Sequence, residues 1–216
     1  MWGVRLSFNF YRRGGYQLEG EDYRWQYVRK CFTTPGTLQA FNLVFIVIYQ
    51  NLLLLLLVAP VYLIAVSGDL DFVYTDFLLV LAFLQLVFIE TIADQQQWNF
   101  QNKKHATFAY GAVRSGDVKA GFLRSGLFRF CRHPNYLAEV VLWWVLAGFT
   151  LSRCGANWSL VGALNLTCLF TGSVHLTEQI SETKYPLYKE YKKTVWSFIP
   201  AVGMIDVRAF VEKKSE

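Results

Sequence analysis

The sequence predicts an all-α membrane protein, a polytopic transmembrane helical bundle with about four spans and cytoplasmic interfacial helices. Hydrophobic residues make up 54% of the 216-residue chain and charged residues only 17%, which is too apolar for an ordinary soluble domain. Several apolar runs are also long enough for membrane-spanning helices, which need about 20 residues each. We therefore treat residues 1–216 as a single membrane-embedded domain.

The spans are predicted in chain order from the apolar runs. A basic, aromatic and amphipathic segment of about 40 residues comes first, with turn signals at Gly14-Gly15 and around Thr34-Pro35-Gly36. A lysine- and tyrosine-rich segment from residue 177 to Pro200 follows the last run and indicates an interfacial helix. The predicted spans are 41–66, 73–92, 136–151 and 158–176.

The basic residues predict the orientation. Six lysines and arginines precede the first span, seven lie between the second and third, and seven follow the fourth, which leaves Arg153 alone on the other side. By the positive-inside rule, both termini and the long central loop face the cytoplasm. We expect a multi-pass protein of the endoplasmic reticulum membrane.

Two classes of function are set aside. A nucleic-acid partner is not required to explain the basic pI, because the positive-inside rule accounts for where the basic residues lie. The four cysteines lack metal-ligand spacing, so we expect free thiols and no metal site. We predict contacts with membrane lipids and no protein partner.

The most informative segment is 125–144, SGLFRFCRHPNYLAEVVLWW. Pro134 suits the first turn of a helix and disfavours a helical residue before it, so a helix should begin near Asn135. Asn135 and Glu139 then share one face. An ionisable residue at the edge of a membrane span is a hypothesis of function, although Glu139 could instead pair with Arg129 or Arg132 as a structural clamp.

The end of the second span carries a second polar group. In ETIADQQQWNFQ, Glu90, Asp94 and Gln101 share a helical face. Their oxygens and amide suit ribose hydroxyls or an adenine edge, and a solvated helix extension is the alternative. The loop that follows carries seven basic residues against one acid, Asp117, and would attract an anionic ligand or anionic headgroups.

The first helix carries a third candidate face. Arg5, Asn9 and Arg13 recur every four residues, as one face of a helix would. A basic helix on the membrane surface would show the same pattern.

Four segments together resemble the membrane reductases related to steroid 5-alpha-reductases. They are RLSFNFYRRGGYQLEGEDYRW, ETIADQQQWNF, GLFRFCRHPNYLAEVVLWW and YPLYKEYKKTVWSFIP. The resemblance implies a helical bundle that holds NADPH and transfers its hydride to a carbon–carbon double bond of a hydrophobic, lipid-like substrate. The cofactor-binding residues it implies are Arg5, Asn9, Asp94, Gln101, Arg129, Arg132, His133, Asn135, Tyr136 and Glu139.

One departure from the family concerns the acid that polarises the substrate carbonyl. The family has further spans ahead of the arginine-rich segment, one of which carries a glutamate for this role, and here that region is missing. We expect either an amino-terminally truncated form or another acid, for which the nearest phenols are the candidate catalytic residues Tyr11, Tyr16 and Tyr23.

Two other readings stay open. Membrane methyltransferases that use S-adenosylmethionine share the Arg-His-Pro-x-Tyr motif seen at 132–136, and Glu178 resembles the acid that they place after their last span. A non-catalytic, truncated membrane protein is the third reading. Glu139 and the Ala-Asp-Gln of the second span favour the reductase.

Overall fold

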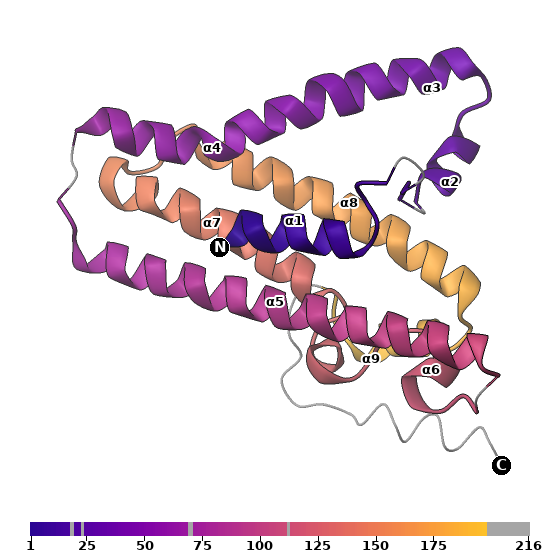
Figure 1. The fold of residues 1–216 in the computed structure, drawn as a ribbon. Helices are drawn as coiled ribbons and strands as arrows, with labels where there is room; N and C mark the ends of the chain where they lie inside the picture. The colour runs from indigo at the N-terminus through magenta and orange to yellow at the C-terminus, as the bar shows by residue number, and fades with distance from the viewer. Residues whose placement is uncertain (18–19, 23, 69–70, 112, 198–216) are drawn as a thin grey trace. The chain divides into compact units, whose positions relative to one another are not determined.

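The computed structural model describes residues 1–17, 20–22, 24–68, 71–111 and 113–197 (Figure 1). Over these ranges the chain forms helices joined by turns and loops, and no strand is present. Four helices are long and apolar enough to cross a membrane: 35–67, 74–109, 134–154 and 160–184. The predicted all-α class with four spans is confirmed.

The helices have the following bounds. In chain order they are α1 (Trp2–Arg12), α2 (Trp25–Val28), the 3₁₀ helix η1 (Arg29–Cys31), α3 (Pro35–Phe41), the π-helix η2 (Asn42–Tyr49), α4 (Gln50–Ser67), α5 (Tyr74–Ala109), α6 (Gly116–Ala120), the 3₁₀ helix η3 (Gly126–Arg129), α7 (Pro134–Cys154), α8 (Leu160–Lys184) and α9 (Tyr188–Thr194).

Two spanning helices are longer than their apolar runs predicted. α5 continues 17 residues past Ile92, and α8 continues eight past Leu176. Neither extension contains a glycine or proline, the strongest breakers of a helix, so the polar turns stay helical. The segment predicted as one interfacial helix from residue 177 is therefore divided between the end of α8 and α9.

The described chain forms two compact units. One comprises Met1–Leu84 and Leu142–Leu169, and the other Gln85–Val141 and Phe170–Glu216, of which the described part ends at Ser197.

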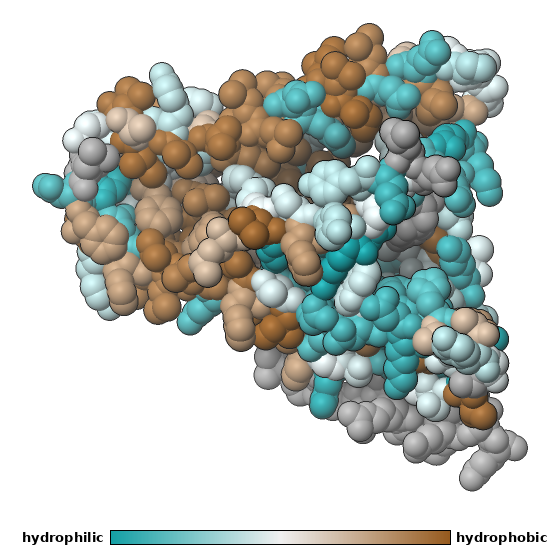
Figure 2. Space-filling view, viewed as in Figure 1, coloured by the Kyte–Doolittle hydropathy of each residue, from teal (hydrophilic) through white to brown (hydrophobic). Residues whose placement is uncertain are grey.

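In the first unit, α4 packs closely against α8. A Cβ atom at Gly162 would overlap the carbonyl oxygen of Leu56, so only glycine allows this approach. Leu53 and Leu57 of α4 are buried. Other apolar side chains of α4 are exposed, and Figure 2 shows this surface as largely hydrophobic, which suits a helix that faces lipid.

The π-helix η2 begins the apolar part of the first span. Phe41, Phe45 and Tyr49 follow one another at intervals of four residues, and their rings stack with centroid separations of 5.1 and 5.4 Å. Stacked rings contribute beyond the apolar area that they bury. This ladder of rings helps to stabilise a helix type that is otherwise rare.

An ion pair joins two segments of the first unit. The Arg153 guanidinium, near the end of α7, donates to the carboxylate of Asp76 in the first turn of α5. The same nitrogen donates to the carbonyl oxygen of Asp71 at 2.6 Å. The one basic residue predicted to lie opposite all the others is thus neutralised by a partner.

The second unit has an aromatic core. Figure 1 shows α6 and α9 close together, and their side chains meet in a buried cluster made of Ala120, Phe122, Tyr188, Tyr191 and Val195. The Tyr191 hydroxyl donates a hydrogen bond to the carbonyl oxygen of Phe128 in η3. Burial raises the pKa of Tyr191 well above its ordinary value.

We predict that Gly162→Ala destabilises the protein. The added methyl group must displace the α4 backbone, and overpacking of this kind costs roughly 1–3 kcal/mol. The readout is the thermal unfolding midpoint in detergent. The matched control is Gly172→Ala, also in α8, where a Cβ meets nothing within 4 Å. That variant should be neutral or slightly stabilised, because alanine favours helix more than glycine does. Equal losses in both variants would contradict the close α4–α8 contact.

We also predict that Tyr191 makes stability fall at alkaline pH. Its folded-state pKa is raised, so the unfolded chain loses the phenol proton first, above about pH 10, while the native state keeps it. This contribution to stability is present below that pH and lost as the pH rises through the folded-state value. Tyr191→Phe should unfold more easily at pH 7 and show a shallower loss between pH 10 and 11.5 in denaturant titrations. A wild-type slope retained by the variant would exclude Tyr191 as its source.

Candidate functional site

A buried ionic cluster lies in the second unit, where residues of α8, α9 and the loop before α7 meet. Glu178 of α8 is only 3% exposed. Its Oε1 accepts from Arg132 Nε at 2.7 Å and its Oε2 from Arg132 Nη2 at 3.2 Å. His133 Nε2 lies 3.1 Å from Oε1, and Lys192 Nζ lies 3.2 Å from Oε2. One carboxylate therefore serves two permanent cations and a histidine.

The contacts in the cluster determine which of its side-chain groups donate hydrogen bonds and which accept them. The forked Arg132–Glu178 contact is the two-pronged geometry that gives strong charge-assisted hydrogen bonds. Because a carboxylate only accepts, a neutral His133 must carry its hydrogen on Nε2, which leaves Nδ1 as an acceptor. The hydrogen bond to Glu182 at 2.7 Å, supported by the contact with Glu178, raises the pKa of Lys192.

A polar strip on α5 holds the loop that leads into α7. Gln96 Oε1 accepts from the backbone N–H of Leu127 at 2.9 Å. Next to it, Gly126 has a φ of +61°, and a Cβ there would overlap the Gln96 side chain. Eight residues after Leu127, the Asn135 side chain reaches the same helix: its Nδ2 lies 3.5 Å from Asp94 Oδ1. This distance is the outer limit of a hydrogen bond.

Tyr136 lies in the first turn of α7. Its ring is stacked on His133 with a centroid separation of 5.6 Å and meets Phe170 of α8 edge-on at 5.0 Å. The motif 132–136 is therefore bound at successive positions: Arg132 and His133 to Glu178, Asn135 to Asp94, and Tyr136 to Phe170.

The other predicted residues of this unit occupy more open positions. Arg129 is exposed at the end of η3, with its guanidinium 5.4 Å from the ring centroid of Phe130. Gln101 is half-buried on α5, and Glu139 is half-buried in the second turn of α7. Their predicted cofactor contacts stay predictions.

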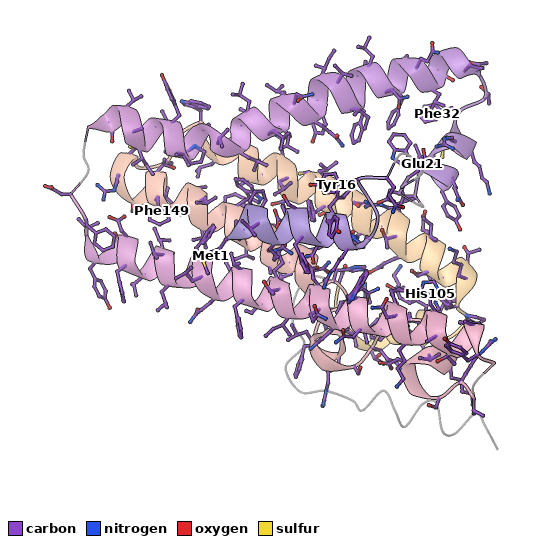
Figure 3. The ribbon with its side chains drawn as sticks, viewed as in Figure 1. Met1, Tyr16, Glu21, Phe32, His105 and Phe149 are labelled. Carbon is purple, nitrogen blue, oxygen red and sulfur yellow. The ribbon has the colours of Figure 1, made fainter. Side chains whose placement is uncertain are left out.

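The predicted residues of the first helix belong to the first unit. Asn9 is buried on α1, and its carbonyl oxygen accepts from Arg13 Nε at 3.2 Å, while Arg5 is half-buried. Tyr11 and Tyr16 are 70% and 66% exposed. Figure 3 shows Tyr16 just beyond the end of α1, where its ring meets Phe10 edge-on at 4.8 Å. Tyr23 lies outside the described residues.

The cysteines are free thiols, as expected: Cys31, Cys131, Cys154 and Cys168. Within the described ranges, no group of three or more histidine, cysteine, aspartate and glutamate side chains is placed to hold a metal ion.

Sequence reasoning missed two residues of this site and left a third to the rival reading. Lys192 and Gln96 were not singled out, and Glu178 was named only for the methyltransferase. A signal for Glu178 did exist. Phe170, Val174 and Glu178 recur every four residues on α8, so the carboxylate continues a face that is otherwise apolar.

The fold and site define a polytopic, helical membrane protein whose fourth span carries a buried carboxylate, Glu178, paired with the arginine before the third span. The chain belongs to the DUF1295 family, described as a protein of unknown function, which it matches over residues 1–195. It is 36% identical over 212 residues to an uncharacterized protein of the fission yeast Schizosaccharomyces pombe. That match covers 93% of this chain and 60% of the relative, so the chain spans about three fifths of the relative's length. No solved structure matches it.

We predict that Glu178→Gln is far more damaging than Glu182→Gln. The first change leaves the buried Arg132 guanidinium without its counter-charge, and breaking a buried pair costs roughly 3–5 kcal/mol. Glu182 and Lys192 are both partly exposed, and such a pair contributes at most about 1 kcal/mol. Chemical unfolding in detergent measures both losses. Similar losses in the two variants would mean that the Glu178 cluster does not hold the unit together.

Proposed function

We propose that this chain is the membrane-embedded part of an NADPH-dependent reductase that acts on a carbon–carbon double bond conjugated to a carbonyl in a hydrophobic substrate. Membership of DUF1295, a family associated with steroid 5-alpha-reductase-like proteins, supports this proposal. So does the resemblance of the four segments described above. We place the protein in the endoplasmic reticulum membrane, with both termini and the cofactor-binding end on the cytoplasmic side.

The observation that carries the proposal is the loose pair between Asn135 and Asp94. It brings an amide and a carboxylate together from two helices that are well separated in sequence. An amide both donates and accepts, as the carboxamide of a nicotinamide requires, while a carboxylate accepts from ribose hydroxyls. At 3.5 Å the contact is at the outer limit of a hydrogen bond, so the Asn135 amide gives up little when it turns to a ligand.

The exposed basic residues of the second unit favour a polyanion. Arg129, Lys103 and Lys119 are exposed in the second unit, and a basic surface raises the local concentration of a cofactor that carries phosphates. Arg129 is the last residue of η3, in which the backbone N–H of Leu127 donates to Gln96. The residues present therefore fit NADPH.

In this reaction the protein binds NADPH and the substrate, orients them, and polarises the substrate carbonyl. When bound, NADPH would supply the hydride for the β carbon of the enone, and water would supply the proton for the α carbon. Negative charge then develops on the carbonyl oxygen, and a hydrogen-bond donor at that oxygen lowers the barrier. We keep the phenols of Tyr11 and Tyr16 as candidate donors, with Tyr23 as a sequence candidate. The apolar walls of the spans suit a lipid substrate.

A second candidate function is transfer of a methyl group from S-adenosylmethionine. The specific observation that favours it is the position of Glu178 beside Arg132 and His133, because a sulfonium favours carboxylates. The charge of Glu178 is already matched by Arg132 and Lys192, however. The carboxylate is thus less available to a cationic ligand, and the reductase remains the better-supported function.

We predict that NADPH raises the unfolding temperature of the purified protein and that Asn135→Ala reduces the effect. A ligand that binds only the folded state adds stability, about 2.7 kcal/mol at a concentration 100 times its dissociation constant. Both cofactors, NADPH and S-adenosylmethionine, are titrated separately in detergent. The matched control is Asn165→Ala, a half-buried asparagine of α8 whose amide donates to the carbonyl oxygen of Val161 in its own helix.

The outcomes separate the functions. Stabilisation by NADPH that is weakened in Asn135→Ala and retained in Asn165→Ala supports the reductase and the site. Stabilisation by S-adenosylmethionine alone transfers the assignment to a methyltransferase. If folded protein responds to neither ligand, the chain is a non-catalytic or incomplete form.

A further inference from the structure

We infer that Arg132 is a positioning residue, which latches the segment Lys192–Ser197 against the start of α7, rather than a ligand of the cofactor phosphates. The inference deepens the proposed function, on which its second part rests.

The segment is held from several directions by the residues before α7. Arg132 Nη1 donates to the carbonyl oxygens of Lys192, at 3.0 Å, and of Val195. The backbone N–H of Arg132 donates to the carbonyl oxygen of Trp196 at 2.9 Å. The Cys131 thiol donates to the carbonyl oxygen of Ser197 at 2.9 Å.

These contacts supply hydrogen-bond donors to carbonyl groups at the end of α9. α9 ends at Thr194, and the last carbonyl groups of a helix have no partner within it. A cation at that end satisfies them and suits the local dipole. Burial also raises the pKa of the Cys131 thiol, so it stays a donor at neutral pH.

Glu178 joins the latch to the candidate site. It holds the other edge of the Arg132 guanidinium, and its Oε1 receives His133 Nε2 together with the Ser197 hydroxyl at 3.4 Å. The same carboxylate therefore sets the position of the motif and of the segment. Asn135 follows two residues after His133, so its placement depends on this junction.

The geometry leaves Arg132 little capacity for another anion. Its side chain is 8% exposed, and Nε, Nη1 and Nη2 all donate to protein acceptors. A phosphate would have to displace Glu178 and leave that carboxylate buried with fewer partners. Arg129 is exposed, so a phosphate can bind it without displacing a buried carboxylate.

The first experiment measures hydrogen exchange of residues 188–197 in cofactor-free protein. Arg132→Lys keeps the charge beside Glu178 but lacks the forked donors that cap two carbonyl groups. We expect exchange in this segment to rise by roughly tenfold or more, as for a locally opened structure. Ser197→Ala, a milder change, should accelerate the end of the segment alone. The matched control is Arg124→Lys, whose partner Asp117 is not part of the latch. Unchanged exchange in Arg132→Lys and Ser197→Ala overturns the latch.

The second experiment compares NADPH affinity in Arg132→Lys and Arg132→Gln. A direct phosphate ligand is partly replaced by lysine, because a point charge still attracts a phosphate, whereas a positioning fork is replaced by neither residue. We expect both variants to weaken NADPH binding alike. Near wild-type affinity in Arg132→Lys, with loss only in Arg132→Gln, overturns the positioning role. If wild-type protein binds no NADPH, the proposed function fails while the exchange result still decides the latch.

Discussion

The second unit depends on the compensation of one buried carboxylate. A charge removed from water is tolerated only with partners close by, and Glu178 finds them in Arg132, His133 and Lys192. Together with Glu178 itself, these residues come from three places in the sequence. Their contacts with one side chain bring together the end of α8, the end of α9 and the residues that begin α7. Because Arg132 is engaged on both edges, the same interaction also determines where the chain runs after α9.

Contact lengths separate two kinds of polar residue in this unit. The Arg132–Glu178 and Gln96–Leu127 contacts are 2.7 and 2.9 Å long and involve buried or half-buried groups. They leave few donors or acceptors unused, which is how a buried polar network stabilises a fold. The Asn135–Asp94 contact is longer, at 3.5 Å, and both of its residues are half-buried. We interpret the tight contacts as scaffold and the loose one as the place for a ligand.

The spans were predictable, and their ends were not. The membrane imposes a length of apolar sequence on every span, so composition alone located all four. Beyond the apolar runs, α5 and α8 stay helical because no breaker intervenes, and that extension has no hydrophobic signal. In the site, the start of α7 followed from Pro134. The partner of Arg132 did not, because Glu178 lies 46 residues away and several acids could have paired with it. The assignment of Arg132 to cofactor binding came from the family resemblance, and local sequence could not weigh it against such a partner.

The ion pair between Arg153 and Asp76 has a consequence for how the first unit responds to an electric field. A transmembrane voltage of 100 mV does about 2.3 kcal/mol of work on each elementary charge carried across it. A neutralised pair presents a small dipole instead of a net charge, so a voltage exerts almost no net force on it. The end of α7 and the start of α5 are therefore held in register by a contact that changes of membrane potential leave undisturbed.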